Sequence, residues 1–182
     1  MTGPRIIAGT WKGRRLVAPI GGDTRPTNIR ARQAVFDILA HAPWCTLRGA
    51  KVLDVFAGTG AYGLEALSRG AAYAWFIEQA PAALAALRAN IAACKALNAS
   101  LIPADALTPP KGEQQDLVFL DPPYGRLLLA PAIAALQHQG WIGAGSVIVA
   151  ELGPDDDIAM PPTMLAERAH GKARLKIWQV PA

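Results

Sequence analysis

The chain has 182 residues, of which 52% are hydrophobic, and it carries a formal net charge of +4. This length predicts one domain with a sizeable core and at most a short appendage. No apolar run reaches the roughly 18–20 residues that a membrane span requires. The amino-terminal stretch MTGPRIIAGTWKGRR lacks the apolar segment of a secretion signal. We therefore expect a cytoplasmic protein without membrane association, and a monomer.

The two cysteines, Cys45 and Cys94, do not show the spacing of metal ligands. Their small number argues against a disulfide framework and suits a reducing compartment. Each is interpreted as a small buried hydrophobic residue, and we expect no bound metal.

The positive charge is concentrated near the amino terminus. Residues 1–48 hold eight lysines and arginines against two aspartates, a net charge of +6. Residues 49–182 hold ten basic and twelve acidic residues, a net charge of −2. A basic arm on a slightly acidic body suggests a polyanion as partner. A solvated basic surface without a partner is the alternative, and charge alone does not decide between them.

The first fifty residues predict a small extension made of a hairpin and a helix. The segments RIIAG and RRLVAP flank a TWKG turn, which is typical of a hairpin. Thr27 is a good N-cap for a helix that runs to about Ala40. The apolar side of this helix holds Val35, Ile38 and Leu39. We expect this extension to be an appendage of the main domain rather than a second core.

From residue 51 onward, apolar strands alternate with helical patterns. The predicted strands are 51–57, 72–78, 100–105, 116–121 and 146–152, and the predicted helices are 61–70, one that begins at Pro81, and 127–139. An exposed loop at 154–162 and two strands around a turn near His170–Gly171 complete the chain. This alternation predicts an α/β fold with a mainly parallel, doubly wound sheet.

A glycine-rich turn follows the first of these strands. Gly58, Gly60 and Gly63 satisfy the pattern G-x-G-x-x-G between a strand and a helix. A dinucleotide would place its pyrophosphate on that helix N-terminus. Glu78, at the end of the second strand, is placed to bind ribose hydroxyls. An NAD-dependent oxidoreductase is therefore one interpretation.

Asp54 favours a different ligand. It lies inside the first strand, four residues before Gly58, where a carboxylate would repel a phosphate and attract an ammonium group. S-adenosylmethionine has no phosphate, so Asp54 fits its methionine end and Glu78 its ribose. Asp105, which closes the third strand, is placed to accept a hydrogen bond from the adenine amine. Each residue also has a structural alternative. Asp54 could be a carboxylate satisfied by turn amides, Glu78 a surface acid at a strand end, and Asp105 a turn-forming aspartate.

The fourth strand ends in Asp121-Pro122-Pro123-Tyr124. Two prolines cannot continue a central strand, because neither donates to the ladder. Asp121 and a proline carbonyl can accept two hydrogen bonds from an exocyclic amine, and Tyr124 offers a ring on which a flipped-out base can stack. This corner predicts methylation of an amine by positioning and electrostatics, without a covalent nucleophile. A plain tight turn is the structural alternative.

Taken together, these segments resemble the RsmD family of small-subunit ribosomal RNA guanine-N2 methyltransferases. The matching segments are RIIAGTWKGRRL at 5–16, RPTNIRARQAVFDIL at 25–39, VLDVFAGTGAYGLEALSRGA at 52–71, DLVFLDPPYG at 116–125, and the closing EL and HGKARLKIW. The resemblance implies a class I SAM-dependent methyltransferase (Rossmann-like) fold, with a seven-stranded, mostly parallel sheet whose last strand is antiparallel. Residues 1–48 would then be an RNA-binding extension, and residues 49–182 the methyltransferase domain.

The resemblance also implies a reaction and a set of site residues. The cofactor would be S-adenosyl-L-methionine, and the target the N2 amine of one guanine in 16S rRNA, within the small ribosomal subunit or its assembly intermediate. The cofactor-binding residues would be Asp54, Phe56, Ala57, Gly58, Thr59, Gly60, Glu78, Gln79, Asp105 and Ala106. The catalytic residues would be Asp121, Pro122, Pro123 and Tyr124. We expect RNA contacts from Arg5, Lys12, Arg14, Arg15, Arg25, Thr27 and Arg30.

Two further alternatives stay open at this point. A methyltransferase for adenine N6 or cytosine N4 amines in DNA or RNA would carry the same corner, although 182 residues leave no room for a large DNA target-recognition domain. A catalytically silent rRNA-binding assembly factor is the other alternative. The intact glycine turn, together with Asp54 and Asp121, argues against it.

Overall fold

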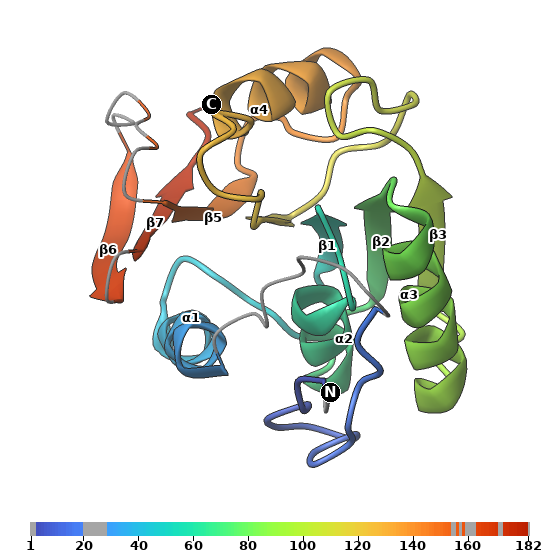
Figure 1. The fold of residues 1–182 in the computed structure, drawn as a ribbon. Helices are drawn as coiled ribbons and strands as arrows, with labels where there is room; N and C mark the ends of the chain where they lie inside the picture. Colours follow the sequence, from blue (N-terminus) through green and yellow to red (C-terminus); the bar gives the residue numbers. More distant parts are fainter. Residues whose placement is uncertain are drawn as a thin grey trace.

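A seven-stranded sheet forms the centre of the molecule, and helices cover both of its faces (Figure 1). The computed structural model describes residues 3–19, 29–153, 156, 158, 163–170 and 173–181. Its elements are α1 (Ile29–His41), β1 (Lys51–Val55), α2 (Ala61–Ser68), β2 (Tyr73–Glu78), α3 (Pro81–Cys94), β3 (Ala99–Pro103), β4 (Leu117–Leu120), α4 (Leu129–His138), β5 (Val147–Leu152), β6 (Met164–His170) and β7 (Ala173–Gln179). The strand order is β3-β2-β1-β4-β5-β7-β6.

The sheet confirms the predicted alternation of strands and helices. The pairs among β1 to β5 are parallel, and β7 runs antiparallel to both β5 and β6. Three strands end earlier than predicted, and one of them is β3, which stops at Pro103. Strand β1 stops at Val55 because Phe56 has a positive φ of 59°, and β4 stops at Leu120 because prolines follow soon after. The predicted helix closure at Gly70 is confirmed by its φ of 102°.

Some of the predicted features lie on residues that the structure does not describe. The proposed cap Thr27, together with Arg25 and the turn residue Gly171, lies outside the described residues. In the loop predicted to be exposed, Asp156 is instead buried, so the prediction is wrong at this residue. Its carboxylate accepts a hydrogen bond of 2.8 Å from the Gly153 N–H. Asp156 therefore satisfies a backbone donor directly after β5.

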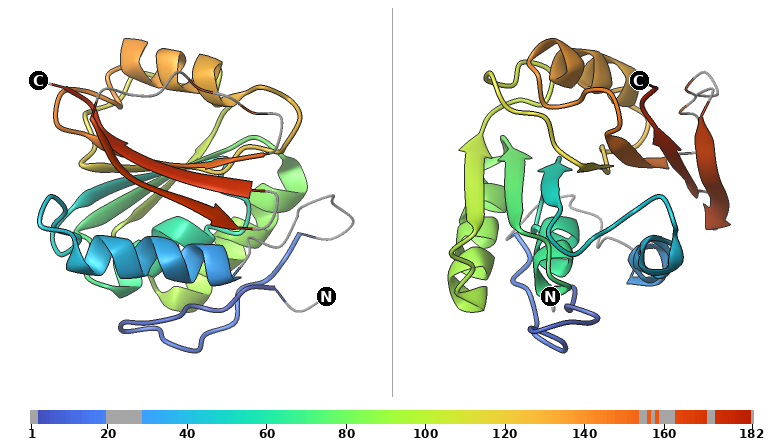
Figure 2. Two further views of the ribbon diagram at one scale, coloured as in Figure 1. Left: turned by 90° about the vertical axis from the view of Figure 1, so that its left-hand side faces the viewer. Right: turned by 180° about the vertical axis from the view of Figure 1, so that it is seen from behind.

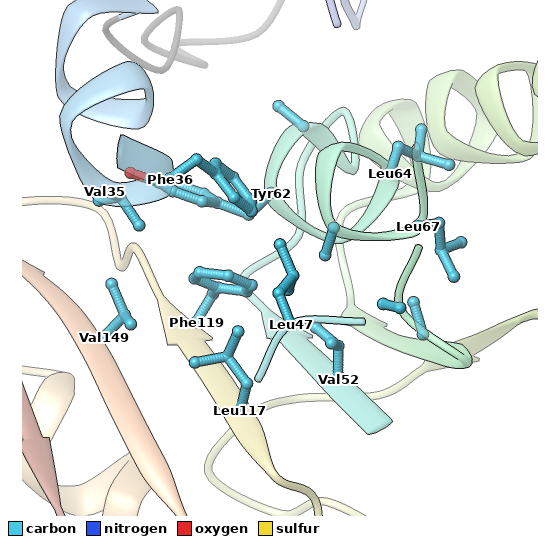
Figure 3. Packing of buried hydrophobic residues seen from close by; sticks show 14 of the residues in the cluster. Val35, Phe36, Leu47, Val52, Tyr62, Leu64, Leu67, Leu117, Phe119 and Val149 are labelled. Atoms are coloured by element: carbon cyan, nitrogen blue, oxygen red, sulfur yellow. The ribbon is translucent and has the colours of Figure 1, made fainter. Parts of the chain in front are cut away.

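Hydrophobic residues form a core on each face of the sheet. One core packs under α1, α2 and α3, and the other packs under α4 on the opposite face (Figure 2). In the first core, the rings of Phe36, Tyr62 and Phe119 point toward one another (Figure 3). Tyr62 stacks on Phe119 with ring centroids 4.9 Å apart, and Phe36 lies 5.6 Å from Phe119. Helix α1 therefore shares its core with the sheet, as an appendage would.

Both cysteines are free thiols, and the predicted burial is confirmed for Cys94. Cys94 is buried and Cys45 is half-buried. Burial raises the pKa of Cys45 to about 11, which keeps this thiol protonated and unreactive near neutral pH.

The predicted amino-terminal hairpin keeps its shape but has little strand pairing. Its two arms form a single isolated bridge, between Arg5 and Arg15. Other backbone donors of the segment bind α2 instead. The N–H groups of Ile7 and Ala8 donate to the Glu65 carboxylate at 2.7 and 3.0 Å. Because Glu65 is fully buried, these donors satisfy a carboxylate that would otherwise be costly to bury, and they fix the hairpin to the domain.

Two arginines complete the surroundings of Glu65. The Nε of Arg69 lies 2.7 Å from Glu65 Oε1, and the Arg69 guanidinium lies 4.8 Å above the Phe36 ring. Arg32 of α1 is fully buried and donates to the carbonyl of Arg5. Burial lowers the pKa of Arg32, and the charge of Glu65 opposes that shift. Glu65 therefore compensates two arginines at the junction of hairpin, α1 and α2.

Replacing Glu65 should destabilise the protein strongly. Glu65→Gln removes the negative charge and leaves Arg69 and Arg32 uncompensated, so we expect the free energy of unfolding to fall by about 3–5 kcal/mol. Urea denaturation followed by circular dichroism measures this change. The control is Lys51→Ala, which breaks an exposed 3.3 Å ion pair with Glu113 and should cost less than about 1 kcal/mol. Similar small losses in both variants would contradict the anchoring role of Glu65.

Candidate active site

The predicted cofactor-binding and catalytic residues lie at the carboxyl edge, defined here by the carboxyl ends of β1, β2, β3, β4 and β5. Strand β1 lies between β2 and β4. The connection through α2 leads to β2 on one face, while the segment between β3 and β4 crosses to the other side of β1. Such a reversal of strand order is where ligands bind in open α/β sheets. The carboxyl edge is therefore the candidate active site.

Asp54 lies inside β1 and is only 3% exposed. Its Oδ2 accepts a hydrogen bond of 2.8 Å from the N–H of Gly63 in α2. A Cβ at Gly63 would lie 2.4 Å from Phe76 Cε1, so only glycine lets α2 approach the sheet this closely. Burial raises the pKa of Asp54 to about 8, and the bond from Gly63 opposes that rise.

The glycine turn is fastened to the end of β2. The N–H of Ala57 donates to the Ile77 carbonyl at 3.1 Å, and the N–H of Gly58 donates to Glu78 Oε2 at 2.9 Å. Gly60 precedes α2 with a φ of 76°, which glycine adopts without strain. Phe56 is also left-handed, at 59°, which costs a bulky residue about 1–3 kcal/mol. Such strain is concentrated at ligand-binding turns.

Glu78 and Asp105 keep acceptor capacity beside this turn. Glu78 Oε1 accepts from the N–H groups of Gln79 and Ala80 at 2.8 and 2.7 Å. Each carboxylate oxygen has two lone pairs, so Oε2, with the Gly58 donor, can accept a further hydrogen bond. Asp105 Oδ1 accepts from the Leu107 N–H at 3.0 Å. The turn-forming interpretation of Asp105 therefore accounts for this one oxygen.

The remaining predicted cofactor residues lie in or next to these turns. The carbonyl of Thr59 accepts a bond of 3.0 Å from Asn90 Nδ2, which also donates to the Val17 carbonyl. Ala106 is buried and Gln79 is exposed. Asn90 therefore links the glycine turn to the amino-terminal segment, a connection that the sequence pattern did not indicate.

The corner after β4 is supported by β5. Asp121 and Tyr124 are half-buried, Pro122 is buried and Pro123 is exposed. The Tyr124 hydroxyl donates to Oε1 of Glu151, near the end of β5. A Cβ at Gly153 would lie 2.9 Å from Tyr124 Cγ, so the ring rests directly against that backbone. Both contacts fix the ring at the carboxyl edge.

Sequence reasoning missed Glu151, Gly153 and Tyr62. An acid in an apolar strand at the carboxyl edge was the signal that selected Asp54, and it applies equally to Glu151 in VIVAEL. Tyr62 needed the structure, because helical spacing alone makes it a core residue. Burial raises its pKa, and the charges of Asp121 and Glu151 add to the rise, which keeps the phenol neutral.

The basic residues predicted to bind RNA are exposed where the structure describes them; these are Arg5, Lys12, Arg14, Arg15 and Arg30. Arg14 donates to the carbonyl of Ala93 near the end of α3, and Thr10 donates to that of Ser68 at the end of α2. Both helices end at the amino edge of the sheet. The hairpin tip (residues 10–14) therefore lies at the opposite end of α2 from the glycine turn, about 12 Å along the helix axis.

Two surface hollows lie away from the carboxyl edge. One, of about 360 Å³, is lined by Leu107, Thr108, Pro109, Ala135, His138 and Gln139. The other, of about 390 Å³, is lined by Trp44, Cys45, Thr46, Arg48, Gly49, Ala50, Asp116, Leu117, Gly145 and Val147. Neither contains a predicted site residue. The chemistry of the carboxyl edge, rather than the size of a hollow, therefore defines the candidate site.

The sequence is similar to that of known proteins over almost its whole length. A profile of the family Conserved hypothetical protein 95 matches residues 4–179. Ribosomal RNA small subunit methyltransferase D of Escherichia coli strain K12 is 37% identical over 180 residues, covering 96% of this chain and 89% of that protein. The protein of the same name from Haemophilus influenzae is 33% identical over 183 residues, covering 96% and 93%.

The fold is similar as well. The solved structure of a putative methyltransferase, yhhF, from Escherichia coli has a TM-score of 0.85 at 37% identity, with 98% of each chain covered. An RNA methyltransferase from Salinibacter ruber, solved with S-adenosyl-L-homocysteine, has a TM-score of 0.63 at 15% identity, with 86% of this chain and 94% of that chain covered, and it supports the fold alone. The class I methyltransferase fold and the resemblance noted in the motifs are thereby confirmed, and this chain belongs to the RsmD family.

Proposed function

We propose that this protein transfers a methyl group from S-adenosyl-L-methionine to the exocyclic N2 amine of a guanine in 16S rRNA of the small ribosomal subunit. One observation carries the proposal: a buried carboxyl beside a glycine turn shares the carboxyl edge with an Asp-Pro-Pro-Tyr corner. The names of the relatives support small-subunit rRNA as the substrate class. The N2 amine follows from the family resemblance.

The carboxyl edge fits S-adenosylmethionine better than a dinucleotide. The Gly63 N–H, which could otherwise bind a phosphate at this helix N-terminus, already donates to Asp54. The antiparallel β7 departs from the parallel order typical of dinucleotide-binding sheets. Asp54 would hold the cofactor's ammonium group, Glu78 its ribose and Asp105 its adenine amine. When bound, this cofactor supplies an electrophilic methyl group on a sulfonium.

The corner residues would act on the target amine. Asp121 and a proline carbonyl of the corner accept its two hydrogens, which turns the nitrogen lone pair toward the methyl donor. Tyr124 provides a ring on which the extruded base stacks. As the nitrogen gains positive charge, the Asp121 carboxylate stabilises it. No covalent intermediate with the protein is required.

Residues 1–48 would serve as the RNA-binding extension. Their exposed lysines and arginines are suited to phosphates, which position an RNA without selecting its sequence. Because the hairpin tip lies at the amino edge, the RNA phosphates that it binds would be remote from the target base.

Within the described part of the chain, every helix is too short or too polar to cross a bilayer.

Methyl transfer to purified small subunits tests the proposal directly. Tritiated S-adenosylmethionine and unmethylated subunits should yield N2-methylguanosine at one mapped position. N6-methyladenosine or N4-methylcytidine as the product would contradict the proposed base. No binding of S-adenosylmethionine in a calorimeter would instead favour the silent assembly factor.

Asp121→Ala should separate catalysis from cofactor binding. The aspartate acts on the target amine, so we expect kcat to fall by about 10²–10³ while the Kd for S-adenosylmethionine changes within a few-fold. Single-turnover kinetics and calorimetry measure the two quantities. Asp116→Ala, at the other end of β4, is the matched control and should retain turnover. Equal losses of turnover and cofactor affinity in Asp121→Ala would contradict the assigned role.

Cofactor affinity should depend on pH through Asp54. In the ligand-free protein this group has a pKa of about 8, so it is protonated at lower pH and must lose its proton to bind an ammonium group. We expect affinity to rise with pH up to about 8, with proton release on binding below that pH. Folding also depends on this group, because Asp54 holds its proton more tightly in the folded protein than in the unfolded chain, where its pKa is 3.8. The free energy of unfolding of the ligand-free protein therefore falls as pH rises from about 4 to about 8.

Asp54→Asn is the variant that tests this dependence. It keeps an oxygen for the Gly63 N–H but cannot carry charge, so affinity should fall about tenfold or more and lose its pH dependence. Calorimetry in buffers of different ionisation enthalpy counts the released protons. Wild-type binding without a pH dependence would refute the assignment.

Lys12→Ala with Arg15→Ala should flatten the salt dependence of subunit binding. Each lost phosphate contact reduces the slope of log K against log salt by about 0.7–0.9. Filter binding over a range of salt concentrations measures the slope. Lys111→Ala, on the loop that packs against Trp141 on the other face, is the charge control. An unchanged slope in the double variant would remove the hairpin from the RNA interface.

A further inference from the structure

Glu151 places a second carboxylate beside Asp121. Strands β4 and β5 are parallel, and Leu120 pairs with Ala150, so Asp121 and Glu151 follow at the same level of adjacent strands. Successive side chains alternate between faces, which directs both carboxylates to the face that carries α2. Both act electrostatically on Tyr62 of α2, which stacks on Phe119. The carboxyl edge therefore presents two neighbouring hydrogen-bond acceptors.

The two oxygens of Glu151 differ. Oε1 accepts from the Tyr124 hydroxyl, whereas Oε2 is buried and has no hydrogen-bond partner among the residues that the structure describes. The whole side chain is more than nine-tenths buried, with 8% of the residue exposed. A buried carboxylate oxygen without a donor is costly, and in a native structure it indicates a missing partner. Oε2 therefore needs a donor from outside the described residues.

Among the bases that carry an exocyclic amine, guanine supplies such a donor. Its N1–H lies next to the N2 amine, so its edge offers adjacent donors to two acceptors. Adenine and cytosine place an unprotonated ring nitrogen, an acceptor, next to their amine. Two adjacent carboxylates match the guanine edge, with its two donors, and repel the ring nitrogen of adenine or cytosine. The Asp-Pro-Pro-Tyr corner cannot make this distinction, because its acceptors contact only the amine and the Tyr124 ring can stack on any base.

We propose that Glu151 selects guanine, by accepting a hydrogen bond from N1–H while Asp121 accepts from the N2 amine. This role rests on the proposed function, since it takes guanine N2 as the reacting group. In the base-free protein, Tyr124 holds the carboxylate through Oε1. Oε2 is buried without a donor among the described residues of the base-free protein, so recognition requires that it becomes accessible as the base edge arrives.

The test compares two target bases that share the 2-amine. Small subunits are reconstituted with RNA that carries guanine or 2-aminopurine at the methylated position; 2-aminopurine has an acceptor at N1. The wild type should methylate guanine with a kcat/KM at least about tenfold above that for 2-aminopurine. Glu151→Gln turns an amide donor toward N1, so this ratio should fall toward one or invert. Wild-type use of both bases at equal rates overturns the proposal, whether or not the variant folds.

Tyr124→Phe is the matched control. It removes the hydroxyl from Oε1 but leaves the Glu151 carboxylate, so it should lower kcat/KM on both bases and keep the preference for guanine. An equal loss on both bases in Glu151→Gln, with S-adenosylmethionine binding intact, would mean that Glu151 merely positions Tyr124, and would overturn the proposal. If the wild type methylates neither base, the proposed function itself fails. A wild type that methylates guanine alone, with an unchanged ratio in Glu151→Gln, rejects only the role of Glu151.

Discussion

The pairing of β1 with β2 on one side and β4 on the other determines the geometry of the whole carboxyl edge. Val55 lies opposite both Ile77 and Leu120, so the three strands end at the same level. The glycine turn, Glu78 and Asp121 follow directly from these ends. A shift in register by one residue would turn Asp54 to the other face, away from Gly63 and α2. The hydrogen-bonded register therefore brings together the glycine turn and the Asp121–Tyr124 corner, which are about sixty residues apart in sequence.

Helix α2 joins the candidate active site to the amino-terminal hairpin through two buried carboxyls, Asp54 and Glu65, which differ in how fully their oxygens are hydrogen-bonded. At its first turn, Gly63 gives Asp54 a hydrogen bond, and the raised pKa of Asp54 reflects a charge that burial disfavours. One half-turn later, Glu65 receives bonds from Ile7, Ala8 and Arg69. The first carboxyl has capacity for a cationic ligand, and the second is already satisfied. Helix α2 thus contributes to ligand binding through Gly63, which contacts Asp54, and to stability through Glu65, which contacts the hairpin.

The sequence predicted the alternating elements well, because each strand and helix has a clear apolar period. It also selected Asp54 and the Asp121–Tyr124 corner, since acids and prolines at strand ends are unusual enough to carry meaning. The destination of the hairpin donors was not predictable, because Glu65 lies 58 residues from Ile7 and helical spacing does not mark it. Arg32 was counted with the basic arm, although it precedes Val35 and Phe36 by three and four positions, which places it on the buried face. The contact between Tyr124 and Glu151 depends on strand order, which the pattern leaves open.

The fixation of the hairpin has a geometric consequence. Its tip contacts the ends of α2 and α3, and its second arm is held at Val17 by Asn90, which also binds the glycine turn. These bonds connect the hairpin and the candidate active site to the same two helices, which limits changes in the distance between them. An RNA that touches both must hold its phosphates and its target base at that distance. The protein would then select RNA by its folded shape. An unfolded strand of the same sequence could contact the hairpin tip or the carboxyl edge, but not both at once.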